Sequence, residues 1–125
     1  MSLVYDAGVL IAADRNDPDV WAEHRSWLER GILPITTAPV VAQVSRSPRQ
    51  AQLRRFLRGC AIEPFTQNGA HAVGALAGAA RTDDVVDAQV VLVAAATSST
   101  VVTSDPEDLQ RLSDRLPNPV PIRSL

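Results

Sequence analysis

The sequence lacks the residues and the long apolar runs that several classes of protein need. Cys60 is its single cysteine, which excludes an internal disulfide or a thiolate zinc site and suits a reducing compartment. No stretch approaches the roughly 18 uncharged apolar residues of a membrane span. The N-terminal MSLVYDAG has neither the charged region nor the long apolar region of a signal peptide. We therefore expect a cytoplasmic protein without a membrane-spanning segment.

Lysine is absent altogether, so the twelve basic residues are all arginines, against fourteen acidic residues. The net charge of −2 argues against non-specific binding of nucleic acid as the main activity. The charges are unevenly placed, because a short stretch contains five of the arginines: Arg46, Arg49, Arg54, Arg55 and Arg58. The acidic residues gather elsewhere. Two interpretations are open, namely an acidic centre beside a basic rim, or ordinary solvated helix faces.

Short apolar runs alternate with helical patterns, which predicts an α/β fold. At 125 residues, 46% of them hydrophobic, the chain is long enough for one domain, residues 1–125, with its own core. Strands are expected at LVY (3–5), ILPITT (32–37), CAIEPF (60–65), STVVTS (99–104) and VPIRSL (120–125), with one or two helices between them. This order predicts a three-layer α/β/α arrangement around a central, mostly parallel sheet.

Three local signals refine this outline. Pro34 predicts an irregularity or an edge position for the second strand. Ser47-Pro48 is expected to open a helix. Gly74 and Gly78, four residues apart in a long helix that Thr66 caps, predict a close contact with another helix.

Two acidic residues directly follow apolar strands. Ligands of parallel α/β sheets bind at the carboxyl ends of the strands, which is where Asp6 and Asp105 fall. Each also precedes a helix, so an N-cap is the alternative interpretation, and Pro106 strengthens it for Asp105. Asp108, one turn later, also suits the positive end of the helix dipole.

The stretch DDVVDAQVVLVAAA places two further carboxylates at the start of an almost wholly apolar, buried helix. Asp84 and Asp87 are three residues apart and therefore share a helix face, where their like charges repel. Compensation of the helix dipole is one explanation for them, and a shared cation is the other. Hard oxygen ligands, without cysteine or a paired-histidine motif, suit Mg²⁺ or Mn²⁺. Such a cluster can activate water and stabilise the charge that develops on a phosphodiester.

One amide interrupts an apolar stretch. In PVVAQVSR, Gln43 lies among Val40, Val41 and Val44, which predict burial of at least one side of a short helix over 38–45. A buried amide without a partner costs about 1–3 kcal/mol. Gln43 is therefore expected to have a partner or to be exposed at a useful position.

Four segments give the chain a resemblance to a known family. They are VYDAGVLIAADR, PVVAQVSR, DVVDAQVVLVAA and VVTSDPEDLQRL, in that order. The chain resembles the PIN-domain nucleases over nearly its whole length, and especially the small VapC-type toxins. The resemblance implies a PIN-like fold, Mg²⁺-dependent endoribonuclease activity on RNA, a homodimer and a cognate antitoxin whose tail enters the site.

The resemblance also implies roles for individual residues. By position, Asp6, Asp87 and Asp105 are the metal-binding acids, and the supporting residues are Asp84, Asp108, Thr103 and Ser104. Arg46, Arg49 and Arg54 would guide the RNA backbone. Two positions depart from the family pattern. Gly8 replaces a threonine or serine whose hydroxyl could contact metal, water or phosphate, and Gln43 replaces a glutamate, which removes a charge from the site.

Two functions follow as competing hypotheses. The first is a metal-dependent endoribonuclease, the toxin of a toxin–antitoxin pair. The second is a catalytically weakened PIN-like domain that binds RNA or a protein partner without cleaving, and Gln43 favours it. A phosphoryl-accepting receiver domain needs a lysine near its last strands, which this chain lacks. Dinucleotide binding lacks support because no G-x-G-x-x-G follows a strand.

Overall fold

The computed structural model describes residues 1–125 and contains one five-stranded sheet in which every pairing is parallel. The strands are short and lie in the order β3-β2-β1-β4-β5. Their bounds are β1 Leu3–Tyr5, β2 Ile35–Thr37, β3 Ala61–Glu63, β4 Thr100–Thr103 and β5 Ile122–Ser124. The predicted mostly parallel sheet is thus confirmed, and it is wholly parallel.

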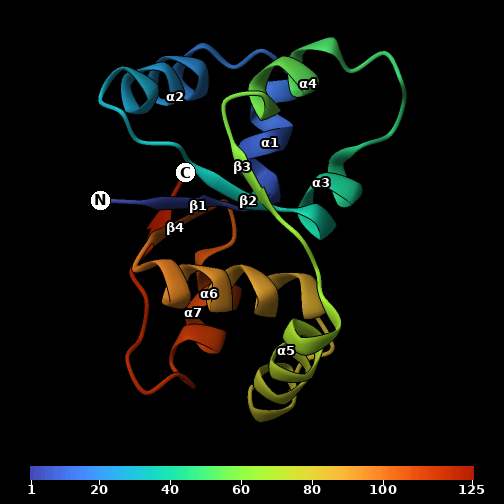
Figure 1. Ribbon diagram of the computed structural model, residues 1–125, viewed down its shortest axis with the longest axis vertical. Helices are drawn as coiled ribbons and strands as arrows, with labels where there is room; N and C mark the ends of the chain where they lie inside the picture. Colours follow the sequence, from blue (N-terminus) through green and yellow to red (C-terminus); the bar gives the residue numbers. More distant parts are fainter.

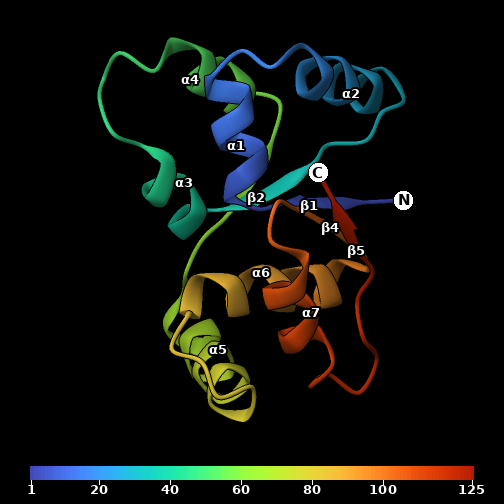
Figure 2. The same ribbon diagram turned by 180° about the vertical axis from the view of Figure 1, so that it is seen from behind.

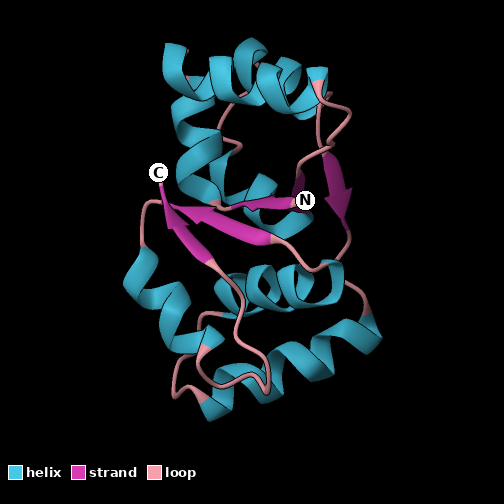
Figure 3. Ribbon diagram, turned by 90° about the vertical axis from the view of Figure 1, so that its left-hand side faces the viewer, coloured by secondary structure: helices cyan, strands magenta, loops and turns pink.

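Seven helices cover the two faces of this sheet. They are α1 Ala7–Asp14, α2 Pro18–Glu29, α3 Ala38–Val44, α4 Ala51–Leu57, α5 Gln67–Ala79, α6 Val85–Thr97 and α7 Pro106–Ser113. Figure 1 shows α1, α2 and α4 above the sheet, α3 beside the end of β2, and α5 to α7 below the sheet, and the view from behind in Figure 2 agrees. The edge-on view in Figure 3 shows the same three layers, as the sequence predicts.

The core lies on both faces of the sheet because its central strands are apolar on both sides. Leu3, Val4 and Tyr5 of β1 are all buried, as are Val101 and Val102 of β4. Helix α6 packs against these strands from below. Four of its residues are fully buried there: Ala88, Val90, Val91 and Ala94. No helix has the length and apolar character needed to cross a bilayer.

The connections place a topological switch point between β1 and β4. The chain leaves the carboxyl end of β1 into α1 on the upper face, whereas it leaves the carboxyl end of β4 into α7 on the lower face (Figure 1). Neighbouring strands whose connections diverge to opposite faces leave a crevice at their carboxyl ends, which is where ligands of such folds bind. Asp6 and Thr103 stand at this crevice.

Three of the local predictions differ from the structure. Pro34 precedes β2, which lies inside the sheet between β1 and β3, so the edge position is wrong. A Cβ atom added at Gly74 or Gly78 would meet no atom within 4 Å, so the predicted close helix contact is also wrong.

The third difference concerns the start of α4, which begins at Ala51 rather than at Ser47-Pro48. The Gln50 side chain accepts hydrogen bonds from the backbone N–H groups of Arg46 (2.6 Å) and Ser47 (3.0 Å). Its own amide donates to the Val44 carbonyl and to Asp14. These four bonds hold residues 46–50 in a loop, because they give the backbone partners outside a helix.

Candidate acidic site at the carboxyl ends of the strands

Asp6 is the buried carboxylate of the crevice. It follows β1, is 6% exposed, and accepts a 2.7 Å hydrogen bond at Oδ2 from the Thr103 hydroxyl. Although Asp6 occupies the N-cap position of α1, its side chain makes no capping hydrogen bond. Burial is the main cause that raises the pKa of Asp6 above its ordinary value, and the Thr103 hydroxyl opposes it. The capping interpretation of its side chain is therefore wrong.

Thr103 links the ends of the two central strands. Its fully buried side chain donates to Asp6 and accepts a 2.9 Å hydrogen bond from the backbone N–H of Asp105. Asp105 is exposed and lies at the N-cap position of α7, again without a capping bond from its side chain. Two aspartates at helix starts thus leave their carboxylates free for another use.

Asp84 does cap a helix, as the dipole interpretation expects. Its Oδ1 accepts a 3.0 Å hydrogen bond from the backbone N–H of Asp87, in the first turn of α6. Asp87 is half-buried. Burial first, and then the charges of Asp6 and Asp84, raise the pKa of Asp87 from 3.8 to about 7. The carboxylates of β1 and α6 therefore lie close enough to repel one another.

No basic side chain neutralises these four aspartates. The structure contains two ion pairs, one between Arg111 and Asp108 at 3.3 Å and one between Arg123 and Glu23 at 2.6 Å. The first of these borders a small cleft of about 80 Å³. The cleft is lined by Thr82, Asp84, Asp87, Asp108, Arg111 and Leu112. The acidic cluster, by which we mean Asp6, Asp84, Asp87 and Asp105, has no ion pair with a basic side chain.

The donor set of the acidic cluster fits a hard divalent cation in chemistry and in charge. Its present arrangement is looser than a metal site, because no three histidine, cysteine, aspartate or glutamate side chains are grouped closely enough to hold one metal ion. Binding of Mg²⁺ or Mn²⁺ would thus require side-chain rotations that bring the carboxylates together. Rotation is easiest for Asp105, which is exposed and makes no capping bond.

Gln43 lies outside the hydrogen bonds of the cluster. Its side chain is exposed near the end of α3, whereas Val40 and Val44 of the same helix face the core. Of the two predictions for Gln43, the exposed position is the correct one. Water can form hydrogen bonds with its side-chain amide. Because α3 starts at the carboxyl end of β2, next to β1, the helix begins at the same edge of the sheet as Asp6.

The predicted RNA-guiding arginines are exposed but do not line the acidic cleft. Arg46 and Arg49 belong to the loop after α3, and Arg54 belongs to α4. Both interpretations of this basic stretch stay open. Arg111 is the basic residue that does line the cleft, and the sequence analysis missed it. Its three-residue spacing from Asp108 on a predicted helix was the available signal.

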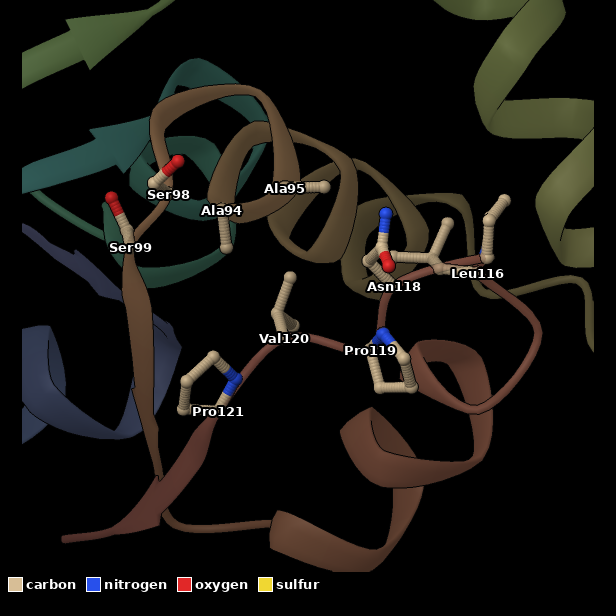
Figure 4. Close-up of a pocket in the computed structure, with 10 residues that line it drawn as sticks. Ala94, Ala95, Ser98, Ser99, Leu116, Asn118, Pro119, Val120 and Pro121 are labelled. Carbon is tan, nitrogen blue, oxygen red and sulfur yellow. The ribbon is translucent and has the colours of Figure 1, made fainter.

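A pocket larger than this cleft lies elsewhere. It measures about 370 Å³ and lies between the end of α6 and the segment 116–121. Figure 4 shows Ala94 and Ala95 facing Val120, Pro119 and Pro121 across it. No carboxylate lines this cavity, so it has none of the chemistry of the crevice at the other end of β4.

Comparison with known proteins defines the fold. No family model and no curated protein matches the sequence. Among solved structures, the crystal structure of VapBC2 from Rickettsia felis bound to a DNA fragment from their promoter matches with a TM-score of 0.74. The match has 20% sequence identity and covers 100% of this chain and 99% of that one. The chain has a VapBC-type fold. The predicted PIN-like, three-layer α/β/α architecture is thereby confirmed.

Proposed function

We propose that this chain is a Mg²⁺- or Mn²⁺-dependent endoribonuclease and the toxin of a toxin–antitoxin pair. The single observation that carries the proposal is the acidic cluster at the switch point of the sheet. Three parts of the chain bring four aspartates to this end of the sheet, and none of the four forms an ion pair with a basic side chain. The VapBC-type fold gives the proposal its biological context.

The residues of the cluster would divide the work. Asp6, Asp87 and Asp105 would hold the cation, with Asp84 as a further ligand. A bound Mg²⁺ or Mn²⁺ would supply the charge that activates water and offsets the negative charge on the phosphodiester. Thr103 would orient Asp6 through its 2.7 Å hydrogen bond, and would hold the backbone of Asp105 in the same register. Hydrogen bonds of this kind commonly fix the orientation of carboxylates that bind a metal.

The proposed substrate is RNA, which carries the negative charge that an exposed arginine stretch attracts. Arg46, Arg49 and Arg54 are the groups that would contact its phosphates. The proposed protein partners are a cognate antitoxin and a second copy of this chain. The similarity to VapBC2 supports the antitoxin, and co-purification with the protein encoded by a neighbouring reading frame would test it.

A second function has its own supporting observation. Gln43 is neutral and is not hydrogen-bonded to the acidic cluster, so α3 adds no carboxylate to the site. A catalytically weakened PIN-like domain would still bind RNA or a protein partner without cleaving. This alternative predicts binding that survives in the absence of cleavage.

One experiment separates the two functions. Cleavage of a structured RNA is measured with Mg²⁺, with Mn²⁺ and with a chelator, for the wild type, Asp6→Ala and Gln43→Glu. Asp114→Ala serves as the control, since Asp114 is an exposed aspartate that bonds only Gln110 on α7. A nuclease cleaves in either metal and loses activity with the chelator and in Asp6→Ala. Absence of cleavage by the wild type, with RNA binding intact, supports the binding module. Activity that appears only in Gln43→Glu identifies a degraded nuclease.

A further inference from the structure

The turn between β4 and α7 packs onto α1 at a position where α1 has no side chain. Gly8 is the second residue of α1, and a Cβ atom added there would overlap the Ser104 Oγ. It would also lie 2.8 Å from the Ser104 Cβ and 3.3 Å from the Ser104 backbone nitrogen. Ser104 thus fills the space that any side chain at position 8 would need.

The backbone conformation does not explain the glycine. Gly31 is the glycine of this chain with a positive φ, and Gly8 lies in ordinary helix. Glycine in a helix is less favourable than alanine, because it loses more conformational freedom on folding. The close approach of Ser104 is therefore the reason that position 8 has no side chain.

A side chain at position 8 could not be accommodated by rotation of Ser104 alone. Rotation about χ1 moves the Oγ atom, but it leaves the Cβ and the backbone nitrogen in place. The backbone of the β4–α7 turn would have to move away from α1. That turn carries Thr103 on one side of Ser104 and Asp105 on the other, while Asp6 lies just before α1.

Two contacts therefore join the same pair of segments. The Thr103 hydroxyl binds Asp6, and Ser104 rests on Gly8 two residues further along α1. The first contact sets the direction of the buried carboxylate. The second sets how closely the turn that carries Asp105 approaches it.

We propose that Ser104, seated in the space left by Gly8, is a positioning residue that sets how closely Asp105 approaches Asp6, and thereby how strongly the acidic cluster binds a divalent cation. The inference rests on the proposed function for the identity of that cation. It also gives a structural reason for glycine at position 8, where the resemblance predicts a threonine or serine.

The test compares the wild type with Gly8→Ala, Ser104→Gly and the double variant Gly8→Ala/Ser104→Gly. Gly74→Ala is the matched control, because it makes the same change in a helix where the added Cβ meets nothing within 4 Å. Thermal unfolding is measured without metal, and Mn²⁺ affinity is measured by calorimetry. Neither measurement depends on RNA cleavage.

We expect Gly8→Ala to lower the unfolding midpoint and to weaken Mn²⁺ binding about tenfold, in the range of couplings between residues in contact. The double variant should recover most of both losses, and Gly74→Ala should keep the wild-type affinity. Wild-type affinity in Gly8→Ala, or no recovery in the double variant, would overturn the inference. Should Gly8→Ala fail to fold, recovery of folding in the double variant supports the contact and continued failure contradicts it.

Failure of the inference differs from failure of the proposed function. A wild type that binds no Mn²⁺ overturns the nuclease proposal and the positioning function together. A wild type that binds Mn²⁺ no better than Gly8→Ala overturns the positioning function alone.

Discussion

The Thr103 hydroxyl donates a 2.7 Å hydrogen bond to Asp6, a residue 97 positions away in the chain. Both side chains are buried, and the same hydroxyl accepts from the backbone N–H of Asp105. One side chain thus satisfies a carboxylate that burial would otherwise leave poorly solvated. It also joins the ends of the two central strands.

Replacement of this hydroxyl tests its double contribution. Thr103→Val keeps the shape of the side chain but leaves Asp6 and the Asp105 N–H without a partner, so we expect a loss of about 1–3 kcal/mol of unfolding free energy. Metal affinity should fall about 10- to 100-fold, as for other residues that orient a ligand. Chemical denaturation and calorimetry measure the two effects. Thr103→Ser, which restores the hydroxyl, should behave as the wild type, and equal losses in both variants would contradict this explanation.

Asp84 combines a cap with a charge, and two substitutions separate them. Asp84→Ala removes both and should destabilise the protein by about 1 kcal/mol, the usual cost of a lost N-cap. Asp84→Ser keeps a capping oxygen for the Asp87 N–H and should restore that stability. Metal affinity should fall in both variants if the charge of Asp84 contributes to binding. Retention of the wild-type affinity in Asp84→Ser would limit Asp84 to a cap.

The raised pKa of Asp87 predicts how metal-free stability depends on pH. Because the folded pKa of about 7 exceeds the ordinary 3.8, the folded state holds more protons than the unfolded state between these values. Stability should therefore fall as pH rises from about 4 to about 7 and then level off. Asp87→Asn should flatten this part of the profile and stabilise the metal-free protein at pH 7. Urea denaturation across this pH range checks it, with Asp114→Asn as the control. A free energy of unfolding that rises from pH 4 to pH 7 would contradict this prediction.

The exposed arginines predict a salt effect rather than a catalytic one. The triple variant Arg46→Gln/Arg49→Gln/Arg54→Gln should bind RNA more weakly and with a shallower dependence on salt, by about 0.7 in slope for each lost phosphate contact. Fluorescence anisotropy over a series of salt concentrations measures this slope. Arg115→Gln, an exposed arginine beyond the end of α7, is the control. An unchanged slope would assign the basic stretch to a solvated surface.

Much of the fold and of the candidate site follows from patterns that parallel sheets impose on a sequence. Apolar runs locate the five strands, and the rule that ligands bind at their carboxyl ends singles out Asp6 and Asp105. The apolar helix after Asp87 predicts its own burial. These inferences depend on local composition and on chain order, both of which a single sequence contains.

The remainder depends on contacts between distant residues. The Thr103–Asp6 hydrogen bond and the Ser104–Gly8 contact form only when β4 lies beside β1. No local sequence pattern predicts either contact. The start of α4 was predicted too early because four hydrogen bonds of Gln50 outweigh the Ser-Pro signal. The exposure of Gln43 follows from helix geometry, since Val40 and Val44, four apart, turn the same face to the core.

The neighbouring positions of β1 and β4 also have a consequence during synthesis. Asp6 precedes Thr103 by 97 positions, and β4 is translated only after α6 is complete. A nascent chain that ends before Thr103 therefore lacks Asp105 and the hydroxyl that binds Asp6. The acidic cluster is therefore assembled only after β4 and the start of α7 have been translated.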